Sequence, residues 1–451
     1  MGEREKPATR WQAVASIFSV IGGGEYSFAI SLILVYGFLG PAFMLGLAAA
    51  VFILRSYVGP LWECAKPKYG FSTKIEGYVN FSTPDYIAAI YGKVPSLLVT
   101  VFAVLAISSL LMLQYVLGAT LISSVSGWGY EISVAFIVLL VALYVIIGSF
   151  TALLHTDFVQ GLLMWAALFV VVVFVYLFQD LGVAHLESVK NLTEKTVGSL
   201  RSINEDPTIF TMFFITAIAA FSGPDIWQRV CIVKDPGDSR LALRNSGFAF
   251  ILFLIPLTLI AIDVQSSGVA GSVDPFRNYI DLKMSANDVA SWPIWLSAIF
   301  AGGLLSAFVS SADTFALLLS SLVQNEYRRW YPKKSETLSR NHTNALVALF
   351  SVFGGVIAMA EPGIPEQFAA VLSLLSVIGA TVLFSLNNKG NRNTAIFAIG
   401  LGGIIALGQA YIVPHYSEGY WVFLPLLPSL AHFFATPKDA KFCIQKETRK
   451  A

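Results

Sequence analysis

Long apolar runs make up most of the chain, and polar residues gather between them. A run of about 20 apolar residues is long enough to cross the hydrocarbon core of a bilayer, and this length predicts about 12 transmembrane helices. The runs lie near 12–36, 40–62, 95–125, 131–150, 156–178, 208–231, 245–265, 291–323, 342–360, 366–386, 394–414 and 420–435. The predicted fold class is therefore an all-α polytopic membrane protein. Segment 70–92 is interpreted as interfacial, and 179–207 and 266–290 as the two longer polar loops.

Helix-breaking residues interrupt the first and the sixth run. The glycines Gly22 to Gly24 fall within the first run, and Gly223-Pro224 falls within the sixth. Glycine weakens a helix and proline removes a backbone donor, so both places are expected to be unwound. Unwound backbone at membrane depth is tolerated only where it lines a cavity or is buried in protein. The alternative is that these glycines serve a close contact between helices.

The two breaks are five runs apart, and this spacing predicts the domain organisation. A repeat with an odd number of spans is inserted upside-down relative to its partner. The spacing therefore predicts a five-plus-five inverted-repeat core with discontinuous helices 1 and 6. The core is expected over 12–386, with 12–178 as the first repeat and 208–386 as the second. Two additional transmembrane helices are expected in 394–435, a cytoplasmic N-terminus in 1–11 and a cytoplasmic tail in 436–451.

The basic residues predict the orientation in the membrane. If the N-terminus lies in the cytoplasm, every Lys and Arg falls on a cytoplasmic segment except Lys190, Lys195, Arg201, Arg277 and Lys283. Cytoplasmic loops of membrane proteins carry such an excess of basic residues. We therefore expect both termini on the cytoplasmic side of a cell inner or plasma membrane.

Composition narrows the classes of function. Of the 451 residues, 56% are hydrophobic and 13% are charged, whereas soluble domains carry about 25% charged residues. The net charge of +1 provides no field to attract nucleic acid. Membrane lipid is the expected surrounding, and the oligomeric state is left open. The chain contains no phosphate-binding loop, nucleophile elbow or transition-metal ligand cluster, so we do not expect an enzyme or an ATP-driven pump.

The candidate chemistry centres on Ser310-Ser311-Ala312-Asp313-Thr314 in the eighth run. On a helix, Ser310 shares a face with Asp313 and Thr314, and Ala307 extends this face by one turn. An acid within a span indicates a functional site, and hard oxygen ligands suit a small cation or a proton. The alternative is that the hydroxyls bond back to carbonyls of the preceding turn, which leaves Asp313 unexplained.

Other polar residues lie near this stretch or near the breaks. Asp157 lies near the start of the fifth run, where it either shares a cation site with Asp313 or caps the helix. Glu25 and Asp225 flank the two breaks and could contact a solute, bind an ion or cap a half-helix. The candidate substrate-binding residues are Gly23, Gly24, Glu25, Tyr26, Gln114, Gly223, Asp225 and Trp227.

Three stretches resemble the sodium:solute symporter family, whose members have the leucine-transporter-type fold. Ser310 to Thr314, followed by Ser320-Ser321 and Glu326-Tyr327, resembles the eighth core helix of that family. Thr156-Asp157 with Gln160 resembles the fifth core helix. Asp225-Ile226-Trp227-Gln228-Arg229 resembles the end of the sixth. The resemblance covers the ten predicted core spans.

The resemblance implies two ion sites. The principal sodium site would use the side chains of Ser310 and Ser311 and the carbonyls of Ala307, Ser19 and Gly22. A second cation or proton site, which sialic acid symporters have, would use Asp157, Ser310, Asp313 and Thr314. Those members usually have a hydroxyl at the position of Asp313, so its carboxylate favours proton coupling or an acid that stands in for the ion. Members also usually carry an extra span before the broken first helix, for which this chain has only about ten residues.

The expected function is that of a sodium-coupled secondary active symporter, which imports a small organic solute by alternating access. Sodium is the expected co-transported ion, with a proton as the alternative. Two other functions remain open. One is a proton-coupled or exchanging amino-acid permease of the same architecture, and the other is a non-transporting solute sensor. The fold does not identify the solute.

Overall fold

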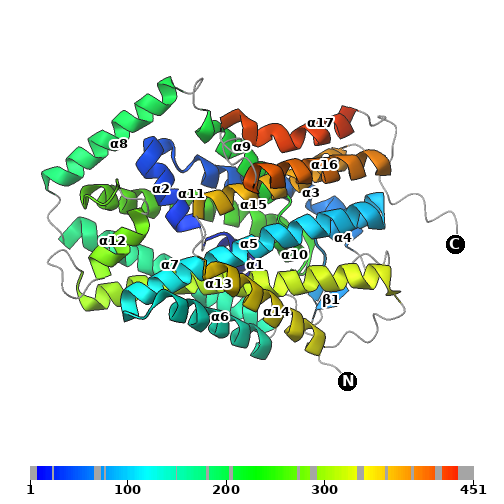
Figure 1. Ribbon diagram of the computed structural model, residues 1–451, viewed down its shortest axis with the longest axis horizontal. Coiled ribbons are helices and arrows are strands. Elements are labelled where there is room, and N and C mark those ends of the chain that lie inside the picture. The colour runs from blue at the N-terminus through cyan, green and yellow to red at the C-terminus, as the bar shows by residue number, and fades with distance from the viewer. Residues whose placement is uncertain are drawn as a thin grey trace.

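Most of the predicted runs form long helices that lie alongside one another in the computed structural model (Figure 1). The structure describes residues 8–22, 25–65, 73–75, 78–148, 150–178, 182–202, 207–271, 275–284, 292–332, 340–360, 364–387, 391–411 and 419–434. The helices are α1 Arg10–Gly22, α2 Glu25–Tyr36, η1 Gly37–Leu39, α3 Ala42–Cys64, α4 Thr83–Tyr91, α5 Lys93–Ser126, α6 Tyr130–Ile147, α7 Phe150–Phe178, α8 Val183–Arg201, α9 Thr208–Phe221, α10 Pro224–Val230, α11 Pro236–Ser266, α12 Pro275–Met284, α13 Ile294–Trp330, α14 Arg340–Ala358, α15 Ile364–Asn387, α16 Arg392–Tyr411, η5 Gly419–Leu426 and α17 Leu427–Phe434.

The predicted break in the sixth run is present. The described residues of the first run form α1, which ends at Gly22, and α2, which begins at Glu25; Gly23 and Gly24, where the first break is predicted, lie outside the described residues. The sixth run is divided into α9 and α10, which are bent by 51° relative to each other. A side chain at Gly223 would meet the Asp225 carboxylate at 2.8 Å and the Ala220 carbonyl at 3.3 Å. A larger residue at Gly223 would therefore crowd the turn and displace the Asp225 side chain.

The sequence predicts about 12 membrane-spanning helices. Fewer helices in the described residues are both long enough and apolar enough to span a membrane. Among the described residues, seven helices are long and apolar enough to cross a membrane, or eight if α9 and α10 form one broken span. Three of the other predicted runs contain shorter apolar helices, at 28–39, 371–386 and 423–434, and the run at 394–414 corresponds to α16. The all-α polytopic fold is thus confirmed, whereas the number of about 12 spans and the inverted repeat remain predictions.

Three segments expected between the spans have regular structure. The two polar loops contain α8 and α12, and the interfacial segment contains α4 and a hairpin of β1 Thr73–Ile75 and β2 Tyr78–Asn80. The strands pair antiparallel, with Thr73 opposite Asn80. Helix α8 forms because it has a face to bury: Leu192 is fully buried, and the Thr196 hydroxyl accepts a hydrogen bond of 2.8 Å from the backbone N–H of Phe38.

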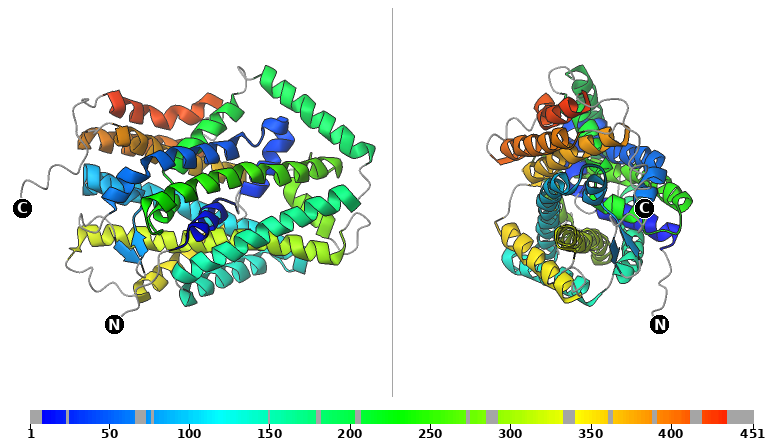
Figure 2. Two further views of the ribbon diagram at one scale, coloured as in Figure 1. Left: turned by 180° about the vertical axis from the view of Figure 1, so that it is seen from behind. Right: turned by 90° about the vertical axis from the view of Figure 1, so that its right-hand side faces the viewer.

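Helix α13 lies in the interior of the bundle. It packs against α5, α7, α14, α1 and α6, and the end-on view shows helices around it (Figure 2). A side chain at Gly303 would meet the Cβ atom of Ala167 at 2.2 Å, so glycine lets α13 approach α7 closely. This packing places the middle of α13 against two other helices that carry polar residues, α1 and α7.

Candidate functional site

The carboxylate of Asp157 joins three helices in the interior. From α1, the Ser16 hydroxyl donates to its Oδ2 atom over 2.5 Å; from α13, the Ser310 hydroxyl donates to its Oδ1 atom over 2.8 Å. All three side chains have no solvent exposure. Because α7 begins at Phe150, about two turns before Asp157, this carboxylate lies inside the helix and does not cap it.

A guanidinium group is buried in the same cluster. Arg229 of α10 is 1% exposed and donates from Nε to the Ser16 hydroxyl and from Nη2 to the Thr314 hydroxyl, both over 2.8 Å. Its Nη1 atom donates to the backbone carbonyl of Asp225 over 3.2 Å. The sequence indicated Arg229 only as part of a family motif and did not place it in this cluster. An arginine directly after a helix break was the signal that could have pointed to it.

Asp313 is the member of the cluster without a partner. Its side chain is fully buried, and neither carboxyl oxygen has a hydrogen-bond partner among the described residues. An ionised carboxylate in such a place is strongly destabilised unless a cation or a donor meets it. Together with Asp157 and Asp225, it makes three buried carboxyl groups within electrostatic range of one guanidinium, that of Arg229. This excess of acids suits the binding of a cation or a proton.

The structure brings together the two helices of the predicted sodium site. Helix α1 contains Ser19 and ends at Gly22, and it packs against α13. On α13, the Ser311 hydroxyl donates to the Ala307 carbonyl over 3.1 Å. Hydroxyls that donate in this way keep lone pairs that can face a cation. The hydrogen bond from Ser311 also matches the back-bonding alternative that the sequence left open.

The predicted solute-binding residues have different surroundings. Glu25 and Tyr26 begin α2, but their side chains, like Gly23 and Gly24, lie outside the described residues. Gly223 precedes α10, and Asp225 lies in the first turn of α10, buried near Arg229. Gln114 of α5 is buried, and its side-chain oxygen has no partner in the part of the chain that the structure describes.

The side chain of Trp227 is held by a backbone carbonyl and by two aromatic rings. Its indole N–H donates to the carbonyl of Phe221 over 2.7 Å, and this hydrogen bond crosses the break between α9 and α10. The indole ring stacks on Phe81 and contacts Tyr86, with ring centroids 6.4 Å and 5.2 Å apart. Trp227 therefore fixes the bend of the broken span against α4 and the segment before it.

A second group of buried and partly buried polar residues, which sequence reasoning missed, lies at the end of the bundle near α4. We call it the polar layer; its members are Asn80, Asp85, Gln228, Asn325, Glu326 and Arg329. Gln228 donates to Asn80 over 2.9 Å, which connects α10 to β2. Arg329 donates to Asp85 over 2.5 Å and also pairs with Glu326. Burial raises the pKa of Asp85, and the Arg329 charge opposes that rise.

Comparison with known proteins shows the family to which the chain belongs. A sequence model of the sodium:solute symporter family matches residues 6–402. The high-affinity proline transporter PutP of Bacillus subtilis (strain 168) is 23% identical over 319 residues. That match covers 66% of this chain and 62% of PutP, so it spans less than two thirds of that relative's length.

Solved structures show the same fold. A Na+-coupled sialic acid symporter in a substrate-bound, outward-open state matches with a TM-score of 0.76 and 15% identity, over 95% of this chain and 88% of that one. MhsT in complex with L-phenylalanine matches with a TM-score of 0.59 and 12% identity, over 95% of this chain and 100% of that one. At these identities the likeness concerns the fold alone.

Proposed function

The chain belongs to the sodium:solute symporter family, and from this premise we propose that it is a sodium-coupled secondary active symporter that imports a small organic solute by alternating access. The family consists of transporters, which agrees with the expectation that the chain is not an enzyme. The observation that carries the proposal is the buried cluster around Asp157, in which α1, α7, α10 and α13 meet.

The principal sodium site in this proposal uses the hydroxyls of Ser310 and Ser311 and the carbonyl of Ala307. Carbonyls of Ser19 and Gly22 complete it in this proposal, and the packing of α1 against α13 supports their inclusion. A sodium ion held there would bind α1 and α13 together. Binding of sodium would thereby stabilise one conformation of the broken first span, and this link couples the ion to the solute.

Asp157, Ser310, Asp313 and Thr314 form the second cation or proton site in the proposal. The excess of buried carboxyl groups over guanidinium supports it. Arg229 already donates to the Thr314 hydroxyl, so this hydroxyl is shared between the arginine and any ion bound nearby. The unpartnered carboxyl group of Asp313 is the observation that favours a proton as the second coupled ion.

The solute is proposed to bind beside the two breaks, at residues of α2, α5 and α10. The candidates are Gly23, Gly24, Glu25, Tyr26, Gln114, Gly223, Asp225 and Trp227. We place the end of the bundle that carries Arg329 and the polar layer in the cytoplasm, since basic residues concentrate on that side. The polar layer then lies between the ion site and the cytoplasm.

Two measurements test the proposed function. A screen of solutes by thermal unfolding, with and without sodium, identifies a ligand because a compound that binds only the folded state stabilises it. Proteoliposomes should then accumulate that solute when a sodium gradient points inward. Accumulation that follows neither a sodium nor a proton gradient would contradict symport. Binding without uptake or counterflow would support the solute sensor, and exchange without net uptake would support the permease.

A further inference from the structure

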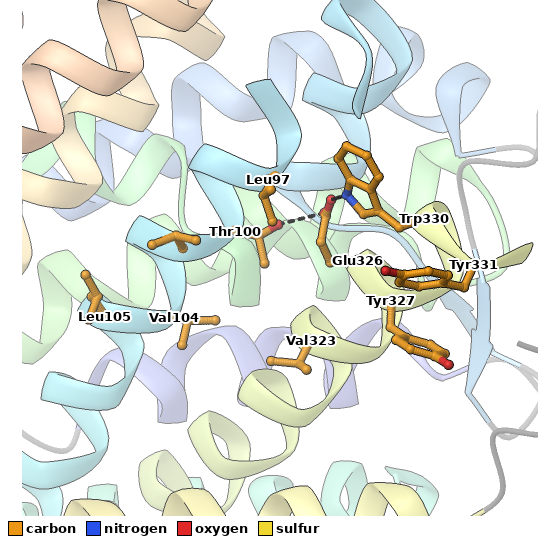
Figure 3. A pocket seen from close by; sticks show the side chains of 10 residues that line it. Leu97, Thr100, Val104, Leu105, Val323, Glu326, Tyr327, Trp330 and Tyr331 are labelled. Atoms are coloured by element: carbon orange, nitrogen blue, oxygen red, sulfur yellow. Dashed lines mark hydrogen bonds between the residues drawn. The ribbon is translucent and has the colours of Figure 1, made fainter. Parts of the chain in front are cut away.

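An apolar groove lies between α5 and α13 at the Arg329 end of the bundle (Figure 3). Its volume is about 590 Å³, which is within the range of sites for small molecules. On α5, Leu97, Val101 and Leu105 follow one another at intervals of one turn, and each is 39–47% exposed. The remaining lining residues are Thr100, Val104, Val323, Glu326, Tyr327, Trp330 and Tyr331.

Three polar side chains inside the groove, those of Thr100, Glu326 and Trp330, are hydrogen-bonded to one another. Glu326 accepts from the Thr100 hydroxyl over 3.0 Å and from the Trp330 indole N–H over 2.8 Å (Figure 3). It also pairs with Arg329. An occupant therefore finds no free donor or acceptor from these groups inside the groove. Only an apolar chain gains by filling it, through the removal of apolar surface from water or from loose lipid contacts.

The rim of the groove has the chemistry of a membrane interface. Tyr327, Trp330 and Tyr331 are 38–55% exposed, and Trp and Tyr collect at the level of lipid headgroups. The Lys93 ammonium lies 5.8 Å from the centre of the Trp330 ring. Lys93 is exposed and forms no ion pair within the described residues. The rim thus presents a positive charge beside aromatic side chains of the kind that collect at the level of lipid headgroups.

We propose that the groove between α5 and α13 binds one anionic phospholipid of the cytoplasmic leaflet, with an acyl chain against Val101 and the phosphate at Lys93. The occupant is a lipid because the lining is apolar, and it is anionic because the rim charge is unpaired. The leaflet rests on the orientation proposed above, whereas the site itself does not depend on transport. A bound chain packs on α13 beside Glu326, so the lipid stabilises the helix end that carries the polar layer.

Retention of lipid by the full-length protein in detergent tests this site without reference to transport. Native mass spectrometry compares the protein after addition of phosphatidylglycerol or of phosphatidylcholine with the same chains. We expect wild-type protein to retain one phosphatidylglycerol about fivefold more strongly than phosphatidylcholine, the preference that one basic residue near a membrane surface supplies. Lys93→Gln should remove that preference, and Val101→Trp should reduce retention of both lipids by filling the groove.

Two matched variants control for general effects. Lys190→Gln removes an exposed lysine from α8, and Leu139→Trp places an indole on the exposed face of α6; both should retain lipid as wild type does. Equal retention of the two lipids by wild-type protein would overturn the proposal, and so would an unchanged preference in Lys93→Gln. If Val101→Trp fails to fold, the comparison of Lys93→Gln with Lys190→Gln still decides.

Discussion

Arg229 and Asp157 share one hydroxyl group, that of Ser16. The arginine donates to the Ser16 oxygen over 2.8 Å, and Ser16 donates its own proton to the Asp157 carboxylate over 2.5 Å. The relay connects α10, α1 and α7. Helix α1 ends where the first break is predicted, and α10 begins directly after the break in the sixth run. The two helices can separate only if the hydrogen bond from Arg229 to Ser16 breaks, so we expect the relay to link the proposed ion site to their movement.

Removing the Ser311 hydroxyl should weaken the principal sodium site. Ser311→Ala is expected to raise the sodium concentration for half-maximal uptake by about tenfold, which corresponds to the loss of one ligand worth about 1.4 kcal/mol. The double change of Ser310 and Ser311 to Ala should abolish sodium stimulation. Uptake by proteoliposomes over a sodium series measures both. Ser188→Ala, which removes a buried hydroxyl in α8, is the control; unchanged sodium dependence in Ser311→Ala would exclude this hydroxyl as a ligand.

Removing the Arg229 charge should destabilise the fold and stop transport. Arg229→Gln leaves Asp157 and Asp225 without the buried cation near them, and losing one partner of a buried pair typically costs about 3–5 kcal/mol. Arg229→Lys keeps the charge but cannot span Ser16, Thr314 and the Asp225 carbonyl. We expect a lower unfolding temperature for both variants and a larger decrease for Gln. Arg244→Gln, at an exposed position of α11, should have little effect; a wild-type unfolding temperature in Arg229→Gln would contradict the cluster.

Replacing Asp313 should separate proton coupling from sodium coupling. Asp313→Asn keeps the shape of the side chain but can neither ionise nor carry a transferable proton. If Asp313 carries the second coupled ion as a proton, uptake by Asp313→Asn should no longer respond to an imposed proton gradient, while sodium still stimulates it. Uptake under crossed sodium and proton gradients measures the two responses. A wild-type protein that ignores the proton gradient would rule out the proton at Asp313.

Breaking the polar layer should expose Cys231 to water. This thiol is 3% exposed and directly follows α10, whose Gln228 bonds to Asn80. With Cys64 and Cys443 changed to serine, Cys231 is the last of the 3 cysteines. Arg329→Gln removes the pairing with Asp85. We expect an impermeant thiol reagent on the Arg329 side to label Cys231 about tenfold faster. This factor corresponds to a destabilisation of about 1.4 kcal/mol of the form in which the polar layer shields Cys231.

The neighbouring charge provides the control for that experiment. Arg328→Gln removes an arginine from the same turn of α13. Within the described residues, Arg328 forms no ion pair. Its labelling rate should equal that of the cysteine background. Equal rates in Arg329→Gln and Arg328→Gln would show that the polar layer does not close this end of the bundle. Labelling requires no solute, so this result is independent of the proposed transport activity.

The apolar pattern located the helices well where they lie in hydrocarbon and poorly where they extend beyond it. The run at 95–125 corresponds to α5, Lys93–Ser126, almost residue for residue. The run at 245–265 is part of α11, which begins at Pro236, and the run at 291–323 is part of α13, which continues to Trp330. Helical hydrogen bonding does not stop at the bilayer surface, so hydropathy shows only the part of a helix that meets lipid.

The candidate site also has one part that the sequence predicted and another that only the folded structure showed. Local sequence was sufficient to place Ser310, Ser311 and Asp313 on one helix and to locate the break at Gly223, because periodicity and backbone chemistry act over a few residues. The partners of these groups come from distant parts of the chain, and no local pattern pairs them. That Asp157 lies within α7 and meets Ser16, and that Arg229 reaches Thr314, was decided by the packing of α1, α7, α10 and α13. Buried polar groups must find partners wherever tertiary packing places them, and only the folded structure shows which ones they found.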